Sequence, residues 1–168
     1  MSETPQQYTA RILGYVEGQP PLVVQAATPA TLERLIAGVP EEALRARPAP
    51  GKWSIAEIVA HLADAEIVGA YRIRLILGAP GTAIAAYDQN DWSRAGHYER
   101  RDPRQSVAQF RAVREANLAL LRLLTPEQWT QFGEHSERGR ETIEHIVRMF
   151  AGHDTNHVRQ IEEILART

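Results

Sequence analysis

Two histidines near the C-terminal end of the chain have the spacing of a metal-binding pair. His153 and His157 are four residues apart, so on a helix they project about 40° from each other on one face. That face also carries the apolar residues Ile146, Met149, Phe150, Ile161 and Ile164. An imidazole buried without a partner costs free energy, so the pair indicates a shared ligand such as a metal ion.

A third histidine lies in another apolar stretch. On a helix, His61 shares its face with Ile58, Leu62, Ala65, Val68 and Arg72. Three neutral imidazoles bind zinc, nickel or iron and leave coordination positions for water or substrate, which is typical of a catalytic site. The alternative is that the spacing arises by chance and that each histidine is a hydrogen-bonded core residue.

The other three histidines are weaker candidates for ligands. His97 and His135 fall in expected loops, and His145 lies about 80° from His153 around a helix. We expect His135 to be exposed on the surface, with a place at the mouth of the site as the alternative.

Several other polar residues can support such a site. Asp64 and Asp154 are the acids nearest in sequence to the histidines and can accept their second N–H, or they are surface carboxylates. Glu66 lies about 140° from His61 and is expected to face away. Arg72 lies about 20° from His61, where it could hold a substrate carboxylate or form an internal salt bridge.

One further polar residue interrupts an apolar stretch. Asn117 lies in the run from Val113 to Leu124. A buried amide there could bond a ligand or the outer nitrogen of a histidine. The alternative is that Asn117 is exposed.

The N-termini of several helices can be predicted because proline is favoured at the first helical position, after a residue that caps the helix. Four such pairs occur: Thr4-Pro5, Thr28-Pro29, Asp102-Pro103 and Thr125-Pro126. Ser54 and Glu57 form a capping box, in which each side chain can bond the other's backbone N–H. We expect Trp53 to be a packing anchor beside that start.

The apolar periodicity predicts an all-α protein. Apolar residues recur at three- or four-residue intervals over the ranges Ile55 to Leu77, Val107 to Leu124 and Ile143 to Leu165. With a helix from Pro29 to Gly38, these make a four-helix bundle, with a short extra N-terminal helix near Gln6 to Val16. Residues 78–101 form a long irregular connection, and strand-like alternation of useful length is absent. We expect one domain, 1–168.

Composition narrows the classes of function. The chain has no cysteine, which excludes a disulfide framework, a thiolate zinc site and a cysteine nucleophile. The net charge is −2, with 19 basic and 21 acidic residues interspersed, so neither nucleic acid nor an anionic membrane is an expected partner. The sequence has neither a leader-like start nor an apolar run long enough for a membrane span. We therefore expect a soluble cytoplasmic protein.

The order of these motifs resembles the DinB-like superfamily and, within it, the YfiT-like metal-dependent hydrolases and bacillithiol transferases. The resemblance rests on residues 50–54 (PGKWS), 61–66 (HLADAE), 71–72 (YR), 86–88 (AYD), Trp92, 152–154 (GHD) and 156–157 (NH). The chain departs from the YfiT-like pattern at Glu66, where that pattern often has a histidine.

The resemblance implies a four-helix bundle with a three-histidine site for nickel or zinc, at His61, His153 and His157, and a homodimer. Some members of the family use a low-molecular-weight thiol such as bacillithiol or mycothiol. Tyr87 and Trp92 resemble family positions near the cleft, where Tyr87 could offer a phenol proton and Trp92 is expected to pack the connection against the bundle.

The function expected from these observations is a metal-dependent enzyme that acts on a small electrophilic molecule. The metal centre would activate water or a thiol, which makes the protein a hydrolase or a thiol S-transferase. His61, His153 and His157 are the expected ligands, and Arg72, Tyr87 and Asp64 are the candidate catalytic residues. The alternative is a non-catalytic stress-response protein that binds a metal or a small ligand.

Overall fold

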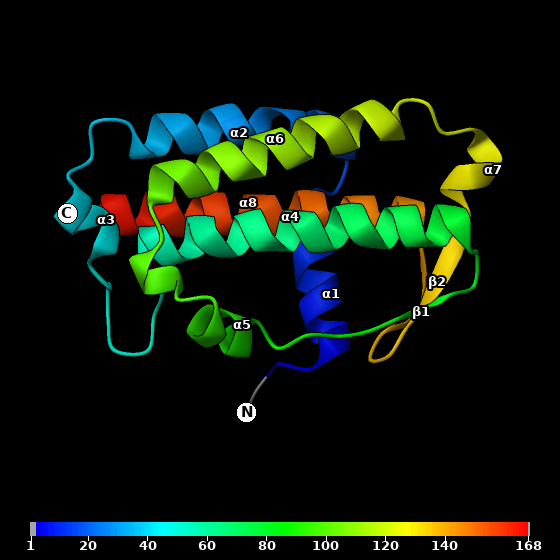
Figure 1. The fold of residues 1–168 in the computed structure, drawn as a ribbon, viewed down its shortest axis with the longest axis horizontal. Helices are drawn as coiled ribbons and strands as arrows, with labels where there is room; N and C mark the ends of the chain where they lie inside the picture. Colours follow the sequence, from blue (N-terminus) through cyan, green and yellow to red (C-terminus); the bar gives the residue numbers. More distant parts are fainter. Residues whose placement is uncertain (1–2, 168) are drawn as a thin grey trace.

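Four long helices form the body of the protein in the computed structural model, which describes residues 3–167. They are α2 (Pro21–Ile36), α4 (Ile55–Gly78), α6 (Pro103–Leu121) and α8 (Ile143–Leu165). Both α2 and α4 pack against α6 and against α8, which closes the bundle (Figure 1). The all-α class and the four-helix bundle are confirmed.

The helix boundaries follow the capping residues in most places. Thr4 caps α1 (Pro5–Gly14), Ser54 caps α4 through the expected capping box with Glu57, and Asp102 caps α6. Thr125 caps the short helix α7 (Pro126–Trp129). The predicted short N-terminal helix is α1, which packs against α8.

The prediction of a helix start at Thr28-Pro29 is wrong. α2 begins at Pro21 and runs through Pro29. Proline lacks an N–H, so Pro29 leaves the carbonyl oxygen of Gln25 without its helical donor. The guanidinium of Arg114 takes that place, with Nη1 donating to the Gln25 oxygen at 3.0 Å. A partner from another helix therefore compensates for the internal proline.

A small sheet at one end of the bundle was not predicted. Within residues 3–167, β1 (Ala83–Ile84) pairs parallel with β2 (Phe132–His135), which pairs antiparallel with β3 (Gly139–Thr142). Strands of two to four residues are too short to show alternation of polar and apolar residues. The connection predicted as irregular contains β1, α5 (Gln89–Ala95) and η1 (Tyr98–Arg100).

Two apolar clusters stabilise the bundle. Ile58, Leu62 and Phe110 belong to the first, and Trp53 packs against its side as expected. Ile76 and Ile146 belong to the second, towards the sheet. None of the helices in the described part of the chain is long and apolar enough to cross a membrane.

The N-terminal helix approaches α8 closely at a glycine. A Cβ atom on Gly152 would lie 2.1 Å from the backbone oxygen of Ile12 in α1. Only glycine allows this approach, which holds α1 over the segment of α8 that carries His153.

Candidate metal centre

The structure brings His61, His153 and His157 together. His61 lies on α4, and the other two lie one turn apart on the adjacent helix α8. One potential ligand atom from each imidazole lies within 4.8 Å of the other two. The Nε2 atoms of His61 and His153 are 2.9 Å apart.

Burial keeps the three imidazoles neutral. Burial and, to a smaller extent, the neighbouring His157 lower the pKa of His61 to about 3. Burial also lowers the pKa of His157 to about 4 and that of His153 well below its usual value. Neutral imidazole is the form that binds a metal ion.

A hydrogen bond orients His157. Its Nδ1 lies 2.9 Å from Oε1 of Gln160, one turn further along α8. Because an amide oxygen only accepts, Nδ1 carries the proton and Nε2 has a free lone pair. This is the support that ligating histidines commonly have, and the sequence analysis did not identify Gln160.

The donor set fits a divalent metal ion. The Nε2 atoms of His61 and His153, 2.9 Å apart, can share a hydrogen bond if one ring carries its proton on Nε2, or they can share a metal ion if both present a lone pair. Zinc–nitrogen bonds of about 2.0–2.1 Å place two tetrahedral ligand atoms about 3.3 Å apart. Only small movements of these side chains would reach that arrangement.

The histidines open onto a cavity of about 320 Å³. His61 and His153 line it, and Ala65, Met149 and Phe150 give it an apolar wall. That volume is at the lower end of the range for small-molecule sites. The cavity can therefore hold a small substrate against the imidazoles.

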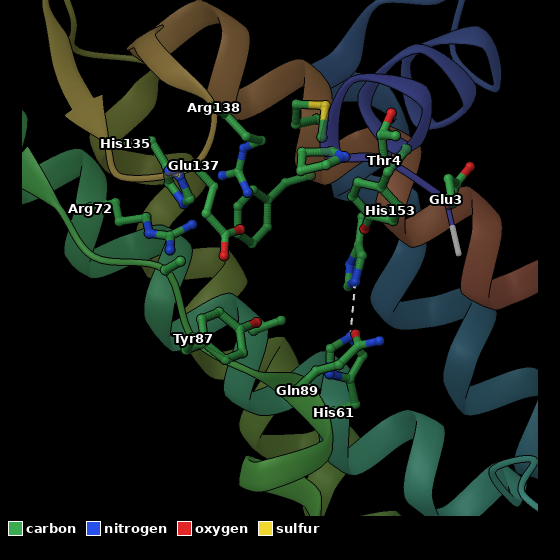
Figure 2. A pocket seen from close by; sticks show the side chains of 16 residues that line it. Glu3, Thr4, His61, Arg72, Tyr87, Gln89, His135, Glu137, Arg138 and His153 are labelled. Atoms are coloured by element: carbon green, nitrogen blue, oxygen red, sulfur yellow. Dashed lines mark hydrogen bonds between the residues drawn. The ribbon is translucent and has the colours of Figure 1, made fainter. Parts of the chain in front are cut away.

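Two of the predicted catalytic residues, Arg72 and Tyr87, line this cavity (Figure 2). Nη2 of Arg72 donates to the carbonyl oxygen of Ala85 at 2.8 Å, and within residues 3–167 Arg72 does not form the internal salt bridge that was one of its two alternatives. Burial raises the pKa of Tyr87, so its phenol is protonated at neutral pH. Trp92 packs on Tyr87 with ring centroids 4.5 Å apart.

Asp64, the third predicted catalytic residue, does not line the cavity. Its carboxylate accepts two bonds from Nη1 of Arg101, at 2.8 and 2.9 Å, instead of a bond from a histidine. Because that guanidinium already satisfies Asp64, a catalytic role for it has no support in the geometry.

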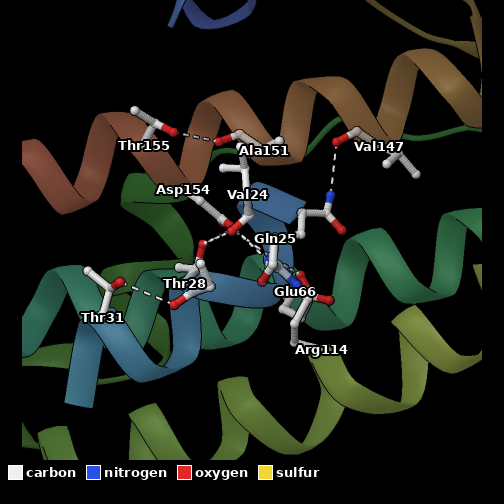
Figure 3. Close-up of polar contacts among 11 residues, drawn as sticks. Val24, Gln25, Thr28, Thr31, Glu66, Arg114, Val147, Ala151, Asp154 and Thr155 are labelled. Carbon is white, nitrogen blue, oxygen red and sulfur yellow. Dashed lines mark hydrogen bonds and ion pairs between the residues drawn. The ribbon is translucent and has the colours of Figure 1, made fainter. Parts of the chain in front are cut away.

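Asp154 also has a partner other than a histidine. Arg114 is fully buried, and its guanidinium binds Asp154 at 2.5 Å and Glu66 at 2.7 Å (Figure 3). Thr28 donates to the same Asp154 oxygen at 2.9 Å. Glu66 binds Arg114 and is not part of the group of three histidines. The network joins α2, α4, α6 and α8 beside His153.

Asn117 is buried, and its hydrogen-bond partner is an arginine and not a histidine. It is 4% exposed, and its Oδ1 accepts a hydrogen bond from Arg74 at 3.2 Å. The interpretation of Asn117 as an exposed residue is therefore wrong.

Sequence reasoning misplaced His135 and missed Tyr8. His135 is 3% exposed and lines the cavity, although we expected it on the surface. It lies on β2, and so short a strand left no sequence signal. Tyr8 of α1 also lines the cavity, and burial raises its pKa. Its position depends on the packing of α1 across α8.

The sequence matches the family described as "DinB superfamily" over residues 26–161. This chain belongs to the DinB superfamily. Among its relatives, the Bacillus subtilis (strain 168) protein named "Putative metal-dependent hydrolase YfiT" is 28% identical over 140 residues, covering 83% of this chain and 79% of that protein. The Halalkalibacterium halodurans protein "Putative metal-dependent hydrolase BH0277" is 24% identical, covering 83% and 81%.

A solved structure also resembles this DinB superfamily member. It is that of YfiT from Bacillus subtilis, described as "a probable metal-dependent hydrolase with an unusual four-helix bundle topology". It aligns with a TM-score of 0.81 and 26% identity, over 99% of this chain and 90% of the other. The resemblance to the DinB-like superfamily noted in the sequence is thus confirmed.

Proposed function

We propose that this protein is a metal-dependent hydrolase whose ion is held by His61, His153 and His157. The observation that supports it most directly is the convergence of three neutral imidazoles, with ligand atoms within 4.8 Å of one another, beside a cavity. Its relatives YfiT and BH0277 are named as metal-dependent hydrolases, which is the same class. Nickel and zinc are the metals we expect.

When bound, a divalent ion polarises a carbonyl and supplies a water-derived nucleophile near neutral pH. The residues of the chain prepare the site for this chemistry. Gln160 fixes the tautomer of His157, and Met149 and Phe150 give the cavity beside the histidines an apolar wall. Tyr87 and Tyr8 keep their phenol protons, so either can donate a hydrogen bond to a carbonyl oxygen or a proton to a leaving group.

Elemental analysis of protein purified without a metal-binding tag tests the ligand assignment. We expect about one nickel or zinc ion per chain, lost in His61→Ala and His157→Ala. His145→Ala is the matched control, because His145 lies on α8 but outside the group of three histidines. Equal metal content in all four proteins would contradict the assignment.

The reaction is tested with a panel of carboxylic esters and amides, with and without an added thiol. We expect hydrolysis that stops on chelation and returns when the metal is restored. Turnover only in the presence of the thiol would indicate thiol transfer instead. Metal uptake without turnover under either condition would favour the non-catalytic binding protein.

A further inference from the structure

One end of the cavity carries two arginines and a histidine and lies apart from the histidine centre. Figure 2 shows Arg72, His135 and Arg138 together on one side, and His61 and His153 on the other. Arg72 comes from α4, His135 from β2 and Arg138 from the turn that follows it. The small sheet therefore brings two of these groups to the helix that carries the third.

Arg72 holds a buried positive charge without a carboxylate partner. Its residue is 7% exposed, and among residues 3–167 no carboxylate oxygen lies within 4.0 Å of its guanidinium. Its contacts are the carbonyl oxygen of Ala85 at 2.8 Å and the ring of Tyr87 at 5.9 Å. Burying an unpaired charge is costly, so an anionic ligand would stabilise this end of the cavity.

His135 presents an unused hydrogen-bond donor beside it. The backbone N–H of Glu137 donates to Nδ1 of His135 at 3.2 Å, so the ring proton lies on Nε2. Nε2 is buried and has no hydrogen-bond partner in the described part of the protein. Burial, Arg138 and Arg72 all lower the pKa of His135, which places Arg72 within electrostatic range of the ring. A ligand oxygen between Arg72 and His135 would satisfy both.

The remaining charges at this end differ in how they are paired. Arg138 binds Glu141 through two bonds, at 2.6 and 3.0 Å, so its charge is largely compensated. Glu137 lines the cavity but is exposed. Within residues 3–167 it forms an ion pair with neither Arg72 nor Arg138. Its carboxylate should therefore weaken, without blocking, the binding of an anion.

We propose that this end of the cavity binds a carboxylate of the substrate, held by the guanidinium of Arg72 and by Nε2–H of His135. As a statement about substrates, the inference rests on the proposed function: the substrate would be a small carboxylic acid whose reacting bond lies at the histidine centre. The anion site itself consists of residues of this chain and needs no metal.

The anion site can be tested on the metal-free protein with benzoate and its uncharged analogue benzamide. By calorimetry we expect benzoate to bind at least about tenfold more tightly, since bonds between charged groups are the stronger ones. Arg72→Met should remove this preference, and His135→Phe should reduce it. Glu137→Gln should increase the affinity for benzoate.

Matched controls separate the site from general effects on the fold. Arg74 lies on the same helix as Arg72, two residues further along, but does not line the cavity, so Arg74→Met is the control for Arg72→Met. His145 also lies outside the cavity, so His145→Phe is the control for His135→Phe. Both should keep the preference for benzoate. If Arg72→Met does not fold, nuclear magnetic resonance of the unaltered protein tests the anion site instead. Benzoate, but not benzamide, should shift the side-chain signals of Arg72 and His135.

The metal-loaded protein tests the link to the reaction. Hydroxamic acids bind metal ions through their head group, and we would compare a series of increasing chain length that ends in a carboxylate with the same series ending in a carboxamide. At one chain length we expect the hydroxamate that ends in a carboxylate to bind at least about tenfold more tightly than the one that ends in a carboxamide. This difference should disappear in Arg72→Met. The affinity for acetohydroxamate, which has no carboxylate, should be the same in that variant as in the unaltered protein.

The two proposals can fail separately. Selective binding of benzoate by a protein that takes up no metal would support the anion site and overturn the metal-dependent hydrolase. Metal uptake with equal affinity for benzoate and benzamide would overturn the anion site and leave the hydrolase standing. A preference for benzoate that persists in both Arg72→Met and His135→Phe would also overturn the anion site.

Discussion

Replacing Arg114 with methionine should destabilise the protein strongly. Arg114, Asp154 and Glu66 are 0%, 1% and 2% exposed, and the guanidinium is the cation between the two carboxylates. Removing one partner of a buried ion pair costs roughly 3–5 kcal/mol, because the remaining charge stays buried. The variant also leaves the Gln25 carbonyl oxygen without a donor. We therefore expect the free energy of unfolding to fall by about 4 kcal/mol.

The loss in free energy of unfolding caused by Arg114→Met should depend on pH. Burial already raises the pKa of Glu66 with Arg114 present, and without the guanidinium the pKa of Glu66 should rise further. A group whose pKa is raised by folding loses its stabilising contribution as pH rises. The difference between Arg114→Met and the unaltered protein should therefore be larger at about pH 7 than at about pH 5.

Urea unfolding of the metal-free proteins, followed by circular dichroism, measures this difference. The matched control is Arg111→Met, one turn earlier on α6, which removes a pair with Glu33 at 2.6 Å on the surface. Exposed ion pairs contribute little to stability, so that variant should unfold almost like the unaltered protein. The reasoning is refuted if Arg114→Met costs less than about 1 kcal/mol or if its deficit is the same at both pH values.

Three further changes test the site and its support. Gln160→Leu removes the acceptor for Nδ1 of His157 and should weaken metal affinity by about 10–100-fold without changing the number of ions bound; calorimetry showing unchanged affinity would contradict this. In the metal-free protein, the lowered pKa of His157, about 4, means that only the unfolded chain takes up a proton near pH 5. Between about pH 6.5 and 5 the unaltered protein should lose roughly 1.5 kcal/mol more stability than His157→Gln, and parallel urea unfolding profiles would exclude this. Gly152→Ala places a Cβ 2.1 Å from the Ile12 oxygen and should cost about 1–3 kcal/mol, whereas Gly78→Ala meets no atom within 4 Å; equal melting temperatures would show that α1 moves aside freely. The homodimer expected from the family resemblance is tested by light scattering, and the mass of a single chain would contradict it.

Sequence alone predicted those features that depend on local patterns. The starts of α1, α4, α6 and α7 follow from a capping side chain and a nearby proline or glutamate, which act within one helical turn. Periodicity along α4 and α8 predicted the inward faces that carry His61, His153 and His157. The burial of apolar side chains determines which face of a long helix points into the bundle. Because the inward faces of α4 and α8 share one core, the histidines that they carry come close together.

Tertiary structure alone decided which polar groups meet. Asp64 and Asp154 each lie within three residues of a predicted ligand, yet both bind arginines, Arg101 and Arg114, that are distant in sequence. His135 reaches the cavity because backbone bonds pair β2 with β1 and β3, and strands this short leave no periodic signal. Side-chain partners and short backbone pairings depend on how elements far apart in the chain approach each other, and no local pattern contains that information.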